Sequence, residues 1–125
     1  MKIIESTQAP EPIGPYSQAT EINGLLFVSG QIAIDRENNN ELKTGSITEE
    51  TAQVMKNIGF ILNQAGYKYA NVVKCSIFIK NMDDFALINS KYGEFFDQNP
   101  PARETVEVSQ LPKNVNVEIS CIAAL

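Results

Sequence analysis

The chain has 125 residues, with 43% hydrophobic and 20% charged side chains, a formal net charge of −5 and no histidine. This length fits one domain, residues 1–125, and the composition is that of a globular protein rather than a disordered chain or a disulfide scaffold. Without histidine, serine–histidine catalysis, cysteine–histidine catalysis and most zinc sites are excluded. Proton transfer would have to use carboxylates, tyrosine, lysine, cysteine, the backbone or water.

The charge and its distribution also limit the partners that we expect. A net charge of −5 opposes the phosphate field of a nucleic acid, and the ten Lys and Arg residues form no basic stripe. The sequence has no Gly-rich phosphate loop, no charged leader followed by an apolar core, and no apolar run as long as a membrane span. We therefore expect no nucleic-acid or membrane partner and a location in the cytoplasm.

Two strands joined by a tight turn are predicted in the first part of the chain. The apolar run Leu25–Ile34 is typical of a central strand, and Asn23-Gly24 predicts a hairpin turn from a preceding strand at Ser17–Ile22. Gly30 lies inside the second strand, where it indicates a bulge or a close backbone approach.

A helix follows the polar loop after this strand. Ser46 and Glu49 fit a capping box, and Gly66 provides a stop. Between them, apolar or small residues recur at helical spacing: Ala52, Met55, Ile58, Gly59 and Leu62. The pattern predicts a helix with one apolar face.

The remaining chain predicts a strand, a helix and two further strands. Val72–Lys80 alternates, with Val73, Cys75, Ile77 and Ile79 on one side, and Asp83–Asp97 has a helical stripe of Phe85, Ile88, Tyr92 and Phe95. The last two strands are Arg103–Ser109 and Val115–Ala124, joined across Leu111-Pro112. This order predicts an α+β fold in which two helices lie on one face of a mixed sheet.

The other face of that sheet is expected to meet a partner. It would carry Phe78, Thr105 and Ile122 among polar residues, and a half-apolar exposed face of this kind usually binds something. We expect self-association through it. Cys75 and Cys121 form no CxxC pair and lie in alternating apolar runs, so both are predicted to be buried, reduced thiols.

An isolated arginine marks the candidate site. The stretch PPARETVEVS sets Arg103 at the start of a strand, and period-2 counting puts Val106 and Val108 under the helices and Arg103, Thr105 and Glu107 opposite. If the last two strands form an antiparallel hairpin, Glu118 lies near Arg103. Arg103 could then grip a small anion with its planar fork of donors, or simply form an ion pair with Glu118 or Glu104.

Four segments, spread across nearly the whole chain, resemble one known family in order and spacing. They are APEPIGPYSQA (9–19), LFVSGQIAID (26–35), PARETVEV (101–108) and VEISCIA (117–123). The chain resembles the reactive intermediate deaminase family, the Rid or YjgF-like proteins, and most closely its RidA branch. Pro-x-Arg combined with a downstream Val-Glu-Ile is the specific part of the match.

The resemblance implies a chorismate-mutase-like fold, assembled as a homotrimer with a central barrel and three ligand clefts between neighbouring subunits. RidA-type members hydrolyse 2-imino acids, such as 2-iminobutanoate and 2-iminopropanoate, to 2-oxo acids and ammonia. These imines come from enamine products of pyridoxal-phosphate dehydratases. No metal or organic cofactor is implied.

The resemblance also assigns roles to residues. Arg103 would hold the substrate carboxylate, Glu118 would position or activate the attacking water, and Tyr16 would close the cleft from a neighbouring subunit. Ser29, Gly30 and Thr105 would line the cleft, largely through backbone groups. Asn89 matches an asparagine that lies close to the site.

Two positions depart from the family pattern. Glu104 follows the arginine where a small or uncharged residue is usual, and it is expected to point to the opposite face from Arg103. Thr105 stands where many relatives have cysteine, which argues against thiol chemistry at the site.

Other functions remain open from the sequence. A non-catalytic trimeric binder or sensor of small 2-oxo acids would need Arg103 without turnover. A ribonuclease, a function described for some family members, is disfavoured by the charge and the lack of histidine, and a holdase-like chaperone would leave no distinctive sequence trace.

Overall fold

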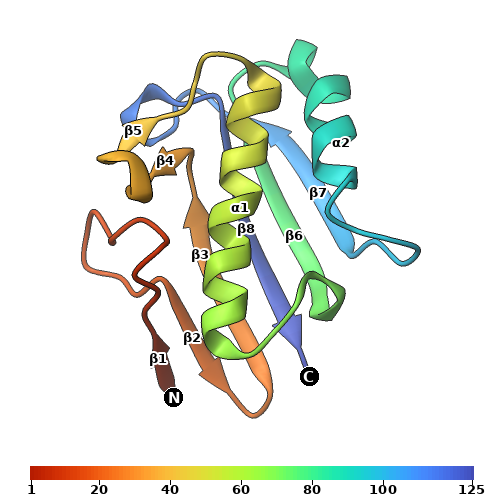
Figure 1. The fold of residues 1–125 in the computed structure, drawn as a ribbon. Helices are drawn as coiled ribbons and strands as arrows, with labels where there is room; N and C mark the ends of the chain where they lie inside the picture. Colours follow the sequence, from red (N-terminus) through yellow and green to blue (C-terminus); the bar gives the residue numbers. More distant parts are fainter.

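The computed structural model describes all residues from 1 to 125, and both helices cover the same face of a six-stranded sheet (Figure 1). The strands lie in the order β1 (Lys2–Ile4), β2 (Ala19–Ile22), β3 (Leu25–Gln31), β8 (Val117–Ala124), β6 (Val72–Ile79) and β7 (Ala102–Glu107). A small second sheet pairs β4 (Ile34–Asp35) with β5 (Glu41–Leu42). The helices are α1 (Ile47–Ala65) and α2 (Phe85–Gly93), which confirms the α+β class and the mixed sheet.

The predicted hairpin between β2 and β3 is confirmed. Asn23 and Gly24 have φ angles of 51° and 77°, which a two-residue hairpin turn requires and which asparagine and glycine tolerate. The register shifts between Val28 and Gln31, so the predicted irregularity at Gly30 is present. β3 ends there, and the last residues of the expected Leu25–Ile34 strand turn aside to form β4.

Helix α1 begins and ends where the sequence indicates. The Ser46 hydroxyl accepts the Glu49 N–H at 3.1 Å, and Gly66 closes the helix with φ 84°. Its apolar face packs on the sheet through fully buried side chains, among them Val54, Met55, Ile58, Ile61 and Leu62. This contact forms most of the hydrophobic core.

A second stripe on α1 is buried and polar. Glu50 accepts the N–H groups of Asn116 and Val117 at 2.7 and 3.1 Å, and the Asn116 side-chain amide at 2.7 Å. Asn57 donates to the carbonyl oxygens of Ile32 and Ile34 at 3.0 and 2.9 Å. The helix thus gives these backbone groups hydrogen-bond partners and fixes the chain after the end of β3 and at the start of β8.

The expected hairpin between the last two strands is wrong. β7 pairs in parallel with β6, while β8 lies on the other side of β6 and pairs with it antiparallel. The chain therefore forms a β6–α2–β7 crossover unit, which parallel neighbours need. Residues 108–116 then pass over to bring β8 between β3 and β6.

This pairing also reverses the predicted faces of β7. Arg103 lies opposite Cys75 and Thr105 opposite Ile77, so both side chains are on the helix-covered face. Val106 lies beside Phe78 on the open face, where it is 41% exposed, and Val108 lies beyond the strand next to a small satellite core. Neither valine lies under the helices.

The end of the second helix and the side on which Val73 lies also differ from expectation. The second helix ends at Gly93 rather than Asp97, because Phe95 and Phe96 leave the helix to pack in an aromatic cluster with Tyr69. A register shift in β6 between Val72 and Lys74 turns Val73 outward, against the predicted alternation.

The open face of the sheet is partly apolar. Its exposed apolar side chains are Ile3, Ile22, Leu25, Phe27 and Val106, with Phe78 and Ile122 half-buried. Cys75 and Cys121 lie opposite each other in the core as free, buried thiols, as predicted, and burial raises the pKa of both. Neither helix is long and apolar enough to cross a membrane.

Candidate functional site

Arg103 lies on the helix-covered face, against two aromatic rings of α2. Its guanidinium carbon is 5.1 Å from the centre of the Tyr92 ring and 5.8 Å from that of Phe85. The side chain is half-buried and forms no hydrogen bond or ion pair with another residue of the chain. The rings attract the cation by cation–π interaction, and its N–H donors have no partner in the chain and are available to an anion.

Two further predicted residues belong to the same arginine cluster, defined as Arg103, Thr105, Asn89, Phe85 and Tyr92. Thr105 is two residues along the same face of β7, and its hydroxyl is buried without a hydrogen-bond partner in the chain. Asn89 is half-buried on α2, one turn from both Phe85 and Tyr92, so it shares their side of the helix. Two chain-distant elements, α2 and β7, therefore build this cluster.

Glu118 lies on the other face, in β8. It is opposite Phe78 and half-buried, and this burial raises the pKa of its carboxyl group. Gly30 packs directly against it, since a Cβ atom at Gly30 would be 2.8 Å from the Glu118 Cδ and Oε2 atoms. The glycine thus makes room for the carboxylate, which explains the close approach expected from its place in a strand.

Tyr16, on the loop between β1 and β2, shares a cleft with Gly30, the residue that packs against this carboxylate. Its ring is 46% exposed, and its hydroxyl oxygen accepts the Ile13 N–H at 3.2 Å, which leaves the phenol proton free to be donated. Tyr16, Gly30 and Ile32 line a narrow cleft with the segment 10–13. Ser29 donates its hydroxyl to the Ser17 carbonyl at 2.6 Å. We call Glu118, Gly30, Ser29 and Tyr16 the glutamate cluster.

The structure therefore brings the predicted residues together in two groups, not one. Arg103 and Glu118 are on opposite faces of the same sheet, so the expectation that they share a pocket within one chain is wrong. The physical reason is the parallel pairing of β7 with β6, in which the side chains of paired residues point to the same face of the sheet. Arg103 is paired with the buried Cys75 and therefore lies on the helix-covered face.

Glu104 lies on the open face, opposite from Arg103, as expected. It pairs with Lys74 at 2.8 Å and accepts a hydrogen bond from Ser76, and the Lys74 contact is the main cause that lowers its pKa. The alternative in which Arg103 is satisfied by Glu104 or Glu118 of its own chain is therefore wrong. The unusual charge beside the arginine is neutralised on the far side of the sheet.

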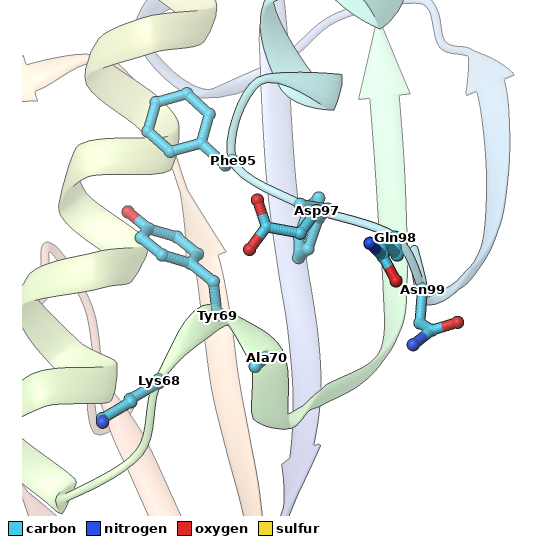
Figure 2. A pocket seen from close by; sticks show the side chains of 8 residues that line it. Lys68, Tyr69, Ala70, Phe95, Asp97, Gln98 and Asn99 are labelled. Carbon is cyan, nitrogen blue, oxygen red and sulfur yellow. The ribbon is translucent and has the colours of Figure 1, made fainter.

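The largest cavity of the molecule, about 790 Å³, contains none of the predicted residues. It lies between Lys68–Ala70 and the loop after α2, and Tyr69 and Phe95 form its aromatic wall with Asp97 nearby (Figure 2). The Tyr69 hydroxyl is used within the fold, because it donates to the Met55 carbonyl at 2.7 Å. Cavity size alone thus points away from the free arginine.

Phe85 and Tyr92 are site residues that sequence reasoning missed. The sequence pattern places them in the apolar stripe of the second helix, where aromatic residues usually pack in the core. The order of the elements could have indicated their role, because the helix that connects two parallel strands packs against those strands. The second of these strands carries Arg103.

Comparison with known proteins identifies the relatives of this chain. Residues 6–125 match the family described as Endoribonuclease L-PSP. A RutC family protein of Synechocystis is 48% identical, over 100% of this chain and 97% of the relative. A protein of Dermatophagoides farinae named 2-iminobutanoate/2-iminopropanoate deaminase is 44% identical, over 99% of this chain and 96% of its own.

Solved structures agree with these sequence matches. The crystal structure of TdcF of E. coli with bound serine superposes with a TM-score of 0.95 at 35% identity, covering 100% of this chain and 99% of TdcF. The predicted family is thus confirmed by sequence, fold and coverage together. The chain belongs to the Endoribonuclease L-PSP family, which is the Rid or YjgF family.

Proposed function

We propose that the protein is an enamine/imine deaminase that hydrolyses small 2-imino acids, such as 2-iminobutanoate and 2-iminopropanoate, to 2-oxo acids and ammonia. The observation that carries the proposal is the half-buried Arg103 guanidinium, which lies against two aromatic rings and has no acidic partner in its own chain. A planar fork of this kind suits the carboxylate of a 2-imino acid. The deaminase name of one 44% identical relative supports the same substrate class.

The catalytic cleft would form between subunits. Because one chain holds Arg103 and Glu118 on opposite faces of its sheet, the arginine cluster of one subunit would meet the glutamate cluster of its neighbour in a homotrimer. The partly apolar open face gives such an assembly a surface to bury. Tyr16, on an exposed loop, would close the cleft beside the neighbour's substrate.

The chemistry asks little of these groups. An iminium carbon is already electrophilic, so the enzyme has to orient the substrate, place one water and move protons. Glu118 would take a proton as the water oxygen bonds to the carbon and the C=N electron pair moves to nitrogen. Proton transfer to nitrogen then lets the C–N bond break, and ammonia leaves as the hydroxyl proton is lost to give the 2-oxo acid.

No metal or organic cofactor is part of this proposal. The residues of both clusters can supply an anion hold, a proton acceptor and a hydroxyl donor by themselves. The substrate side chains expected are short, and we place the activity in the cytoplasm, where the dehydratases that make these imines would work.

A coupled assay tests the proposed reaction. Threonine dehydratase converts threonine to an enamine, which becomes 2-iminobutanoate and then hydrolyses slowly to 2-oxobutanoate. Added wild-type protein should speed 2-oxobutanoate release in proportion to its concentration, while dehydratase turnover stays constant. Release at the uncatalysed rate would rule the deaminase out.

A non-catalytic binder of small 2-oxo or amino acids is the second candidate. The arginine cluster stands apart from Glu118 within one chain, and the related TdcF structure contains bound serine, which carries the same carboxylate group. Calorimetric titration of 2-oxobutanoate separates the candidates. Binding that depends on Arg103 without any imine hydrolysis would favour the binder.

A further inference from the structure

The loop that carries Tyr16 has no regular structure, yet its first part is buried. Ser6, Ala9 and Pro10 are buried, and the side chains that bond their carbonyl groups come from the far end of the loop and from the segment after β4. Buried carbonyl groups must find donors, so these donors decide where the loop lies. Two residues supply them, Gln18 and Arg36.

Gln18 is buried and uses both ends of its amide on this loop. Its Oε1 atom accepts the Ser6 N–H at 2.6 Å. Its Nε2 group donates to the carbonyl oxygens of Pro10, Ser6 and Ala9 at 2.8, 3.1 and 3.3 Å. One side chain therefore fixes both edges of the segment 6–10, and Tyr16 follows six residues after Pro10.

Arg36 reaches two of the same carbonyl groups from the other side. Its NH1 group donates to Ser6 and Ala9 at 3.2 and 3.0 Å, and its NH2 group pairs with Glu11 at 2.9 Å. Because the two side chains share acceptors, the loss of either one leaves carbonyl groups that the other satisfies only in part.

Gln18 also connects this loop to the strand that bears Gly30. Its backbone carbonyl accepts the Ser29 N–H at 2.9 Å, and the neighbouring Ser17 carbonyl accepts the Ser29 hydroxyl. The loop is therefore linked to β3, just before its irregularity, through the adjacent residues Ser17 and Gln18. Any shift of Gln18 would change the position of Tyr16 relative to Gly30 and Glu118.

We propose that Gln18 and Arg36 are positioning residues that set Tyr16 over the cleft lined by Gly30, the residue that packs against Glu118. The proposal rests on the proposed function, in which Tyr16 closes that cleft. Gln18 also lines this cleft, but its amide is bonded to the loop backbone, as is the Arg36 guanidinium, so we assign both residues a role through the loop rather than on the substrate.

The test replaces the side-chain amide nitrogen of Gln18 with an oxygen atom. Gln18→Glu keeps the acceptor for Ser6 but turns an oxygen toward three carbonyl groups, which repels the loop. The matched control is Gln8→Glu, the same chemical change on an exposed side chain of the same loop. Arg36→Gln is the second variant, because its side chain is less buried and its loss should leave the core intact.

Hydrogen exchange gives a readout that does not require activity. We expect the amides of Ile13, Tyr16 and Ser17 to exchange at least about tenfold faster in Gln18→Glu and Arg36→Gln, with helix α1 unchanged. Gln8→Glu should match wild type. Unchanged hydrogen exchange in both Gln18→Glu and Arg36→Gln overturns the proposal, even if the wild-type chain proves to have no deaminase activity.

Kinetics then separate positioning from a merely structural role. Gln18→Glu should lower kcat/KM for imine hydrolysis about tenfold, and this loss should shrink to less than about twofold in a Tyr16→Ala background, where no ring remains to be placed. Equal losses in both backgrounds overturn the proposal. A wild-type chain without imine hydrolysis refutes the proposed function instead, and the exchange result still decides whether Gln18 and Arg36 hold the loop.

Discussion

The arginine cluster and the glutamate cluster differ in what holds them and in which side of the sheet they use. Arg103 is fixed by aromatic rings of α2 on the helix-covered face, and its cation has no counter-charge in the chain. Glu118 is fixed against Gly30 on the open face, in surroundings that raise its pKa. Each cluster has the group that the other lacks, which is why we assign them to two subunits of one cleft.

Two of the buried polar residues of α1 help to position the glutamate cluster. Glu50 fixes the backbone just before Glu118, and Asn57 fixes the chain just after Gly30. The backbone that carries the glutamate cluster is therefore positioned by hydrogen bonds from side chains of α1. The arginine cluster depends instead on packing between α2 and β7.

Removing the arginine should have the largest effect. Arg103→Ala is expected to lower kcat/KM for imine hydrolysis by at least about a hundredfold, or about 2.7 kcal/mol, because a charge-assisted bidentate contact is lost. Arg103→Lys keeps the charge without the fork and should fall between. Steady-state kinetics, with light scattering to verify the oligomer, give the answer. Activity near wild type in Arg103→Ala would assign the arginine a structural role only.

Replacing the glutamate should lower turnover more than binding. Glu118→Gln is expected to reduce kcat about a hundredfold with little change in KM, because the water loses its proton acceptor. Burial raises the Glu118 pKa above the ordinary value of 4.5, and the reaction needs the carboxylate. The wild-type kcat should therefore fall, as the pH is lowered, at a pH above 4.5.

The same pKa shift makes a prediction about stability. A carboxyl group whose pKa is raised by folding destabilises the folded state as the pH rises through its ordinary and raised values. Glu118→Gln should thus gain thermal stability relative to wild type across that interval, and the difference should vanish below it. The measurement is the melting temperature of both proteins as a function of pH. A difference between them that stays constant with pH would show that folding does not shift the Glu118 pKa.

Adding a methyl group at Gly30 should have a smaller effect. The Cβ atom in Gly30→Ala would displace the Glu118 carboxylate, and we expect a loss of about tenfold in kcat/KM. The melting temperature should change little, since the end of a glutamate side chain can move. Gly93→Ala, which adds a methyl group into open space at the end of α2, is the matched control. Equal activity of both variants would separate Gly30 from the site.

Much of the fold follows from local sequence patterns. The hairpin at Asn23-Gly24, the cap at Ser46 and the stop at Gly66 each depend on neighbouring residues only, and all three are confirmed. The buried side of β8 was also predicted, since Val115, Val117, Ile119 and Cys121 alternate without a break and are all buried.

The face of β7 was not predictable in this way. In the edge strand ARETVE, one phase carries Ala102, Glu104 and Val106 and the other only polar residues, so its alternation favours burial of the Val106 side, which in the structure is the open face. The partner strand decides, and the parallel partner is indicated only by the helix that lies between Val72–Ile79 and Ala102–Glu107. That one long-range pairing moved Arg103 to the other face and divided the site.

Mixing two inactive variants tests the division of the site most directly. In the proposed homotrimer, Arg103→Ala and Glu118→Gln subunits that are unfolded and refolded together in equal amounts would leave about one cleft in four with an intact Arg103 and an intact Glu118. We therefore expect the mixture to recover about a quarter of wild-type imine hydrolysis, while each variant refolded alone stays inactive. A mixture of demonstrably mixed trimers that is as inactive as its components would contradict a cleft shared between neighbouring subunits.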